Sequence, residues 1–111
     1  MAKIISVKEA AELVKDGAVI GSAVQGMAGW PEEIGIAIEK RFLETGHPAG
    51  ITHIHGAGQG DFGRMSPDGK TCRGECVLAH DGLMACSIHG HVGCSFKVTK
   101  QIVDNKILAY N

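Results

Sequence analysis

Helix-like and strand-like segments alternate along this chain. Ser6 and Glu9 have the spacing of a capping box, and apolar residues at helical intervals follow from Val7. Further helices are predicted over residues 31–46 and 96–103. Small or β-branched runs predict strands at residues 18–24, 51–55, 85–89 and 107–110. This alternation favours an α/β fold, a three-layer α/β/α arrangement with a mostly parallel sheet.

The same patterns predict which residues are buried. The run 18–24 has little polar alternation, which favours a strand that is buried on both faces. The second helix is expected to begin at Pro31 and to end at Gly46. Its buried face is expected to consist of Ile34, Ala37, Ile38 and Phe42.

The length of 111 residues predicts a single domain, residues 1–111. The sequence stops directly after a predicted strand, so we expect the first part of a larger α/β domain. Such a chain would have an unpaired edge strand and an uncovered apolar face, and both features promote association. We therefore expect a homo-oligomer.

Charge and hydropathy each exclude one class of partner. Eleven Lys and Arg residues against twelve Asp and Glu give a net charge of −1, with no basic block. A nucleic-acid partner is therefore not expected, since phosphate neutralisation needs a basic excess. No apolar run approaches the ~20 residues of a membrane helix, and the first residues lack a signal-peptide core. We expect no membrane partner and a cytoplasmic location.

The chain has sixteen glycines, and several of them lie in two predicted loops, residues 25–30 and 56–60. Each loop follows a predicted strand, so both should lie at the carboxyl edge of a parallel sheet. Glycine lets backbone N–H groups approach a ligand closely, and a glutamine amide adds a donor. The candidate substrate-binding or CoA-binding residues are Gln25, Gly26, Gly29, Gly58, Gln59 and Gly60. The alternative is that both loops are simply tight turns.

Two phosphate-binding motifs are matched only in part. Residues 58–63 spell G-x-G-x-x-G, but a turn follows where a dinucleotide site needs a helix. The run Gly69-Lys70-Thr71 resembles a P-loop. Five residues instead of four separate it from Gly63, and Gly74 interrupts the helix that should follow. We favour neither interpretation.

The cysteines and histidines do not have the spacing of a structural zinc site. Cys72, Cys76, Cys86 and Cys94 lack the two close pairs that such sites use, so we expect free thiols and no bound metal. His53 and His55 share one strand face, a spacing compatible with a ligand pair but more typical of a strand edge. The alternative function is a non-catalytic metal- or thiol-binding module formed by residues 72–94.

Several ordered motifs together resemble a known family. They are Asp16-Gly17, Gly26 followed by Pro31-Glu32, residues 39–46, 58–61 and 79–83, Gly90-His91, and residues 104–111. In this order they resemble the N-terminal portion of family I CoA-transferases, of the propionate or acetate CoA-transferase type. The resemblance covers nearly all 111 residues.

The resemblance implies transfer of CoA from a short-chain acyl-CoA, such as propionyl-CoA or acetyl-CoA, to a free carboxylate. Coenzyme A is then a substrate, and no resident cofactor is expected. The family uses a glutamate that forms a mixed anhydride and then a glutamyl-CoA thioester. That glutamate lies in the second half of the family's polypeptide. The resemblance therefore assigns no catalytic residue here, and it implies a partner, the remaining CoA-transferase sequence or subunit. We expect the chain alone to be inactive.

Overall fold

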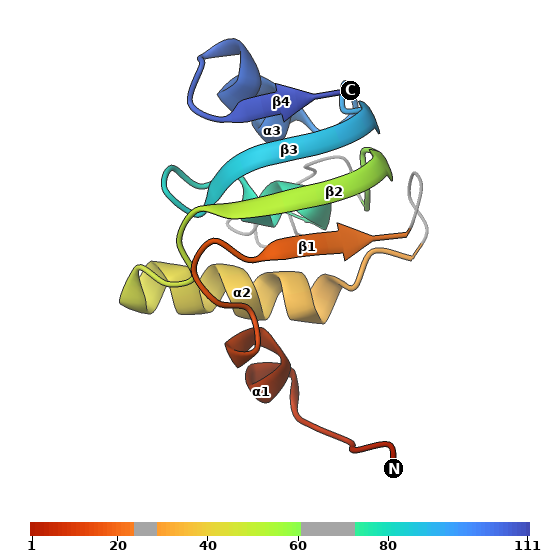
Figure 1. The fold of residues 1–111 in the computed structure, drawn as a ribbon, viewed down its shortest axis with the longest axis vertical. Helices are drawn as coiled ribbons and strands as arrows, with labels where there is room; N and C mark the ends of the chain where they lie inside the picture. The colour runs from red at the N-terminus through yellow and green to blue at the C-terminus, as the bar shows by residue number, and fades with distance from the viewer. Residues whose placement is uncertain (24–28, 61–72) are drawn as a thin grey trace.

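A computed structural model describes residues 1–23, 29–60 and 73–111. Four parallel strands form one sheet in the order β1-β2-β3-β4 (Figure 1). The strands are β1 (Val19–Ser22), β2 (Ile51–Ala57), β3 (Met84–His91) and β4 (Leu108–Tyr110). The helices are α1 (Val7–Glu12), α2 (Glu32–Thr45), the 3-10 helix η1 (Gly74–Leu78) and α3 (Phe96–Val103). The predicted α/β fold with a mostly parallel sheet is confirmed.

The start of α1 and the end of α2 form as their sequences predict. The Ser6 side chain accepts a hydrogen bond from the Glu9 backbone N–H, and the Glu9 carboxylate accepts one from the Ser6 N–H. At the end of α2, Gly46 has a φ of 75°, and its N–H donates to the Phe42 carbonyl at 2.7 Å. Glycine suits this left-handed position because it has no Cβ.

The core lies between one face of the sheet and the helices. In Figure 1, η1 and α3 lie behind the strands, and α2 runs below β1. The buried apolar residues of this layer come from the strands, the helices and the loops between them: Ala11, Ile38, Ile51, Cys76, Val77, Leu78, Leu83, Met84, Val98 and Ile107. No described helix is long and apolar enough to cross a membrane.

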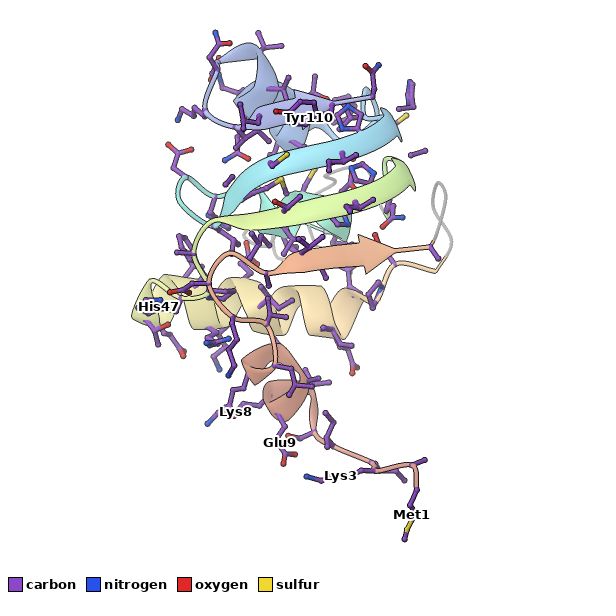
Figure 2. All side chains as sticks on the ribbon, in the orientation of Figure 1. Met1, Lys3, Lys8, Glu9, His47 and Tyr110 are labelled. Atoms are coloured by element: carbon purple, nitrogen blue, oxygen red, sulfur yellow. The ribbon has the colours of Figure 1, made fainter. Side chains whose placement is uncertain are left out.

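The opposite face of the sheet, called here the bare face, carries exposed apolar side chains. The strand register places its large members on one side of the sheet: Val19, Ile54, Ile88, Leu108 and Tyr110. Figure 2 labels Tyr110, the last residue of β4. Among the described residues no helix covers this face, so the described layers are two. The expected uncovered apolar face is present.

The prediction that the first strand is buried on both faces is wrong. Val19 is 65% exposed, because β1 lies at the edge of the sheet and one of its sides belongs to the bare face. In α2, the predicted core positions of Ala37, Ile38 and Phe42 are confirmed, and that of Ile34 is wrong. Ile34 is exposed, and α2 instead approaches the core at Gly35, where a Cβ would lie 2.8 Å from the Trp30 ring.

Candidate functional site

The two glycine-rich loops meet at the carboxyl edge of the sheet. Ser22, the last residue of β1, pairs with His55 of β2 in the strand register. The Ser22 hydroxyl donates to Gln59 Oε1 at 2.6 Å, and Gln59 Nε2 donates to the Ser22 carbonyl at 3.3 Å. A Cβ built on Gly60 would lie 3.4 Å from Trp30 Cβ. In their described parts, the loops therefore share one edge, as the sequence predicts.

The candidate binding residues at this edge differ in accessibility. Gly58, Gln59 and Gly60 are buried, whereas Gly29 is exposed. Gln25 and Gly26 lie outside the described residues. The Gln59 amide is used to join the loop to β1. Gly60 has a φ of 74° and packs against Gly74, so the fold itself requires glycine there.

A group of ionisable side chains is buried beneath this edge. We call His53, His55 and Glu75 the histidine–glutamate cluster. The alternation of β2 directs both imidazoles to the core face, where their ring centroids lie 4.5 Å apart. Glu75 of η1 meets them there. Its Oε2 lies 3.8 Å from His53 Nδ1 and 3.4 Å from His55 Nδ1, and all three side chains are at most 2% exposed.

The hydrogen bonds around His53 determine where its proton lies. Ser22 has one hydroxyl hydrogen, which it donates to Gln59 Oε1. Ser22 Oγ therefore accepts its second bond, at 2.7 Å, from the N–H of His53 Nε2. The neutral ring then carries an unprotonated Nδ1. Both His53 Nδ1 and Glu75 Oε2 are buried without a hydrogen-bond partner.

Burial opposes charge on each member of the cluster. Loss of solvent, together with the neighbouring His55, lowers the pKa of His53 to about 3. Burial also lowers the pKa of His55, although its bond to the Ala57 carbonyl acts in the opposite direction. Burial raises the pKa of Glu75 to about 8, partly offset by a backbone hydrogen bond from Gln59. All three side chains of the cluster are therefore neutral near pH 7.

The described cysteines do not gather into the alternative site that the sequence left open. Cys76 is buried in η1, Cys86 lies beside Leu108 in the sheet, and Cys94 precedes α3. Within the described ranges, the residues with metal-ligating atoms close together are His53, His55 and Glu75. Cys72 lies outside these ranges. The described thiols therefore supply no ligand group.

Comparison with known proteins finds similarity to CoA-transferases. No family model matches the chain. It is 38% identical over 110 residues to the caffeate CoA-transferase of Acetobacterium woodii, which covers 99% of this chain and 20% of that protein.

Two crystal structures of the acyl-CoA transferase YdiF from Escherichia coli O157:H7 share the fold. A thioester complex with CoA matches with a TM-score of 0.76 and 27% identity, over 96% of this chain and 20% of that one. The apoenzyme matches with a TM-score of 0.75 and 26% identity, over 97% and 20%. The chain thus spans about one fifth of the length of these relatives. In both sequence and fold, it is similar to a one-fifth portion of CoA-transferases.

Proposed function

We propose that this chain is part of an acyl-CoA:carboxylate CoA-transferase. The observation that carries the proposal is the 38% identity to a CoA-transferase along 99% of the chain. The YdiF structures support it independently, because the same four-stranded parallel arrangement recurs in an acyl-CoA transferase bound to CoA as a thioester.

The carboxyl edge of the sheet is the proposed contribution to the substrate site. Open parallel sheets bind ligands at this edge. Exposed Gly29 would offer its backbone to the acyl or CoA group, together with Gln25 and Gly26 of the same loop. Gly58, Gln59 and Gly60 would act mainly by holding the second loop in shape, since they are buried and Gln59 is bonded to Ser22.

The proposed substrates are a short-chain acyl-CoA, such as propionyl-CoA or acetyl-CoA, and a carboxylate. The transfer is proposed to need no resident cofactor. The proposed location of the protein is the cytoplasm. Caffeate, from the name of the Acetobacterium woodii relative, is a second acid to test.

The nucleophilic glutamate is proposed to lie in the remaining CoA-transferase sequence. Covalent transfer needs a carboxylate that substrate can reach and that water cannot. Among the described glutamates, Glu75 is fully buried and accepts a hydrogen bond from Ser95. Glu9 caps α1 at the surface. Neither of these two is placed to attack an acyl-CoA. Because the family resemblance assigns the nucleophile to sequence outside this chain, the chain should require its partner sequence.

A segment exchange tests the proposal. The matching fifth of the Acetobacterium woodii caffeate CoA-transferase is replaced by this chain, and CoA transfer to caffeate, acetate and propionate is measured. The control carries the enzyme's own segment, re-inserted at the same junctions. Transfer to at least one acid supports the proposal. A hybrid that folds and assembles like the control but transfers CoA to none of them would overturn it.

A further inference from the structure

We propose that His53, His55 and Glu75 form a buried site for a divalent transition-metal ion of the zinc class. The sequence allowed His53 and His55 as a ligand pair but favoured a strand edge. That interpretation is wrong, because both side chains are buried on an inner strand. The fold creates the site by placing Glu75 of η1 against two neighbouring histidines of β2.

The separations fit an ion held between the side chains. Zinc binds histidine nitrogen at ~2.0–2.1 Å and carboxylate oxygen at ~2.0–2.2 Å. His53 Nδ1 and Glu75 Oε2 are 3.8 Å apart, which is too long for a hydrogen bond and is spanned by two such bonds. The 3.4 Å between His55 Nδ1 and the same oxygen is also within reach. The three ligand atoms all lie within 4.8 Å of one another.

Two orphaned atoms of the cluster point to a cation. His53 Nδ1 carries no hydrogen, because the Ser22 hydroxyl accepts from the opposite nitrogen of the ring. It faces Glu75 Oε2 in the interior, and neither atom has a hydrogen-bond partner. A bare lone pair opposite a carboxyl oxygen is a poor arrangement in a dry core. One metal ion would satisfy both atoms.

Each proposed ligand is held from behind by a serine hydroxyl. Ser22 binds His53 Nε2 at 2.7 Å, Ser87 binds His55 Nε2 at 3.1 Å, and Ser95 donates to Glu75 Oε1. His55 Nδ1 lies 3.0 Å from the Ala57 carbonyl, which can only accept, so this nitrogen carries the proton and His55 Nε2 accepts from Ser87. An ion at His55 Nδ1 would replace this hydrogen bond. The proton would move to Nε2, which would then donate to Ser87, and Ser87 would donate to His89 Nδ1. Such outer hydrogen bonds orient the ligands of metal sites.

The donor set selects the class of ion. Two imidazoles and one carboxylate suit zinc and its neighbours, whereas calcium and magnesium prefer oxygen ligands throughout. Two histidines with one glutamate are also a known three-ligand zinc set, in which a fourth position remains for another ligand.

Metal content tests the proposal without reference to CoA transfer. The 111-residue chain is refolded with zinc, freed of loose ions, and measured by elemental mass spectrometry. We expect about one zinc per chain, and at least a tenfold lower zinc content in His53→Leu and in Glu75→Gln. Glu39→Gln is the matched control and should keep its zinc. Glu39 forms a direct hydrogen bond with His80 at 2.6 Å, so this variant also alters a histidine–glutamate pair, but one with no room for an ion between its atoms.

Two further measurements distinguish ligand loss from misfolding and from binding by thiols. Circular dichroism of the metal-free variants shows whether they fold. X-ray absorption by the zinc-bound wild type, which needs no variant, should show nitrogen and oxygen neighbours at ~2.0–2.2 Å and no sulfur at ~2.3 Å. The proposal is overturned if the refolded wild type binds no zinc, if sulfur ligands appear, or if a folded Glu75→Gln variant retains the full zinc content.

Discussion

At the scale of single residues, the carboxyl edge of the sheet depends on glycines that have no room for a side chain. Gly60 has a φ of 74°, and a Cβ there would overlap the Cα of Gly74. Gly50 has a similar φ of 68°, but a Cβ there would meet nothing within 4 Å. The two positions therefore separate backbone strain from steric overlap.

We predict that Gly60→Ala destabilises the chain more than Gly50→Ala. The strain of the left-handed backbone costs about 1–3 kcal/mol at either position, and the overlap with Gly74 adds a further cost at Gly60 alone. Urea unfolding of both variants measures the difference. Equal losses in the two variants would show that Gly74 moves aside without cost.

The Asp16 carboxylate gives a prediction about pH. It accepts hydrogen bonds from the Ala49 N–H and from His47, which lies beyond the end of α2 (Figure 2). These bonds, the Ala49 bond foremost, lower the pKa of Asp16 from its ordinary 3.8. Its stabilising contribution is therefore present above about pH 4 and is lost as pH falls through the lowered folded-state value.

Asp16→Asn should therefore be less stable than the wild type at pH 6, and the gap should narrow towards pH 3. Urea unfolding at the two pH values measures the gap, and Asp104→Asn controls for the loss of a surface carboxylate. A gap of the same size at both pH values would rule out this contribution of Asp16.

At the scale of helices and strands, Arg41 joins the first two helices. Its guanidinium, on α2, donates to the Ala11 and Val14 carbonyls at 2.9 and 2.7 Å, near the end of α1. Ala11 lies in the last turn of α1 and Val14 just beyond its C-cap, in the region where helical carbonyls lack intrahelical donors. A charged donor therefore anchors a six-residue helix that is too short to be stable by itself.

We predict that Arg41→Met loosens α1 while α2 and the sheet persist. Methionine keeps an apolar stem but removes the two hydrogen bonds from the charged guanidinium. Each such bond contributes at most about 1.5–3 kcal/mol to the free energy of unfolding. Amide hydrogen exchange should accelerate in α1 and remain slow in β2. Lys40→Met, at a neighbouring exposed side chain, is the control and should leave α1 protected.

Sequence patterns predicted the positions of helices and strands better than they predicted which side chains are buried. The capping box, Gly46 and the β-branched runs act locally, so they placed the helix ends and the strands. Burial depends on sheet order, and for that reason the edge position of β1 was missed. In the site, strand alternation brought His53 and His55 together. Glu75 lies twenty residues beyond His55 and reaches them only through the fold.

At the scale of the whole molecule, the bare face predicts self-association. Exposed Ile54, Ile88 and Tyr110 share one side of the sheet with other apolar residues. Exposed apolar patches of this kind favour association in water. The chain should therefore sediment above 11.7 kDa at tens of micromolar.

Ile88→Lys should shift the chain towards the monomer, because it places a charge in the middle of the bare face. Leu43→Lys adds the same charge at an exposed position on α2 and should leave association unchanged. Analytical ultracentrifugation measures the molar mass of the wild type and of the two variants. A compact wild-type monomer at these concentrations would refute the prediction that the bare face drives association.

The most direct test of the CoA-transfer account is the location of the covalent intermediate. The hybrid enzyme that carries this chain is incubated with propionyl-CoA and treated with borohydride, and its peptides are analysed by mass spectrometry. We predict one modified glutamate, in the sequence outside these 111 residues, and no modification of the isolated chain. A modified glutamate within the 111 residues, or none in a folded hybrid, would contradict the account.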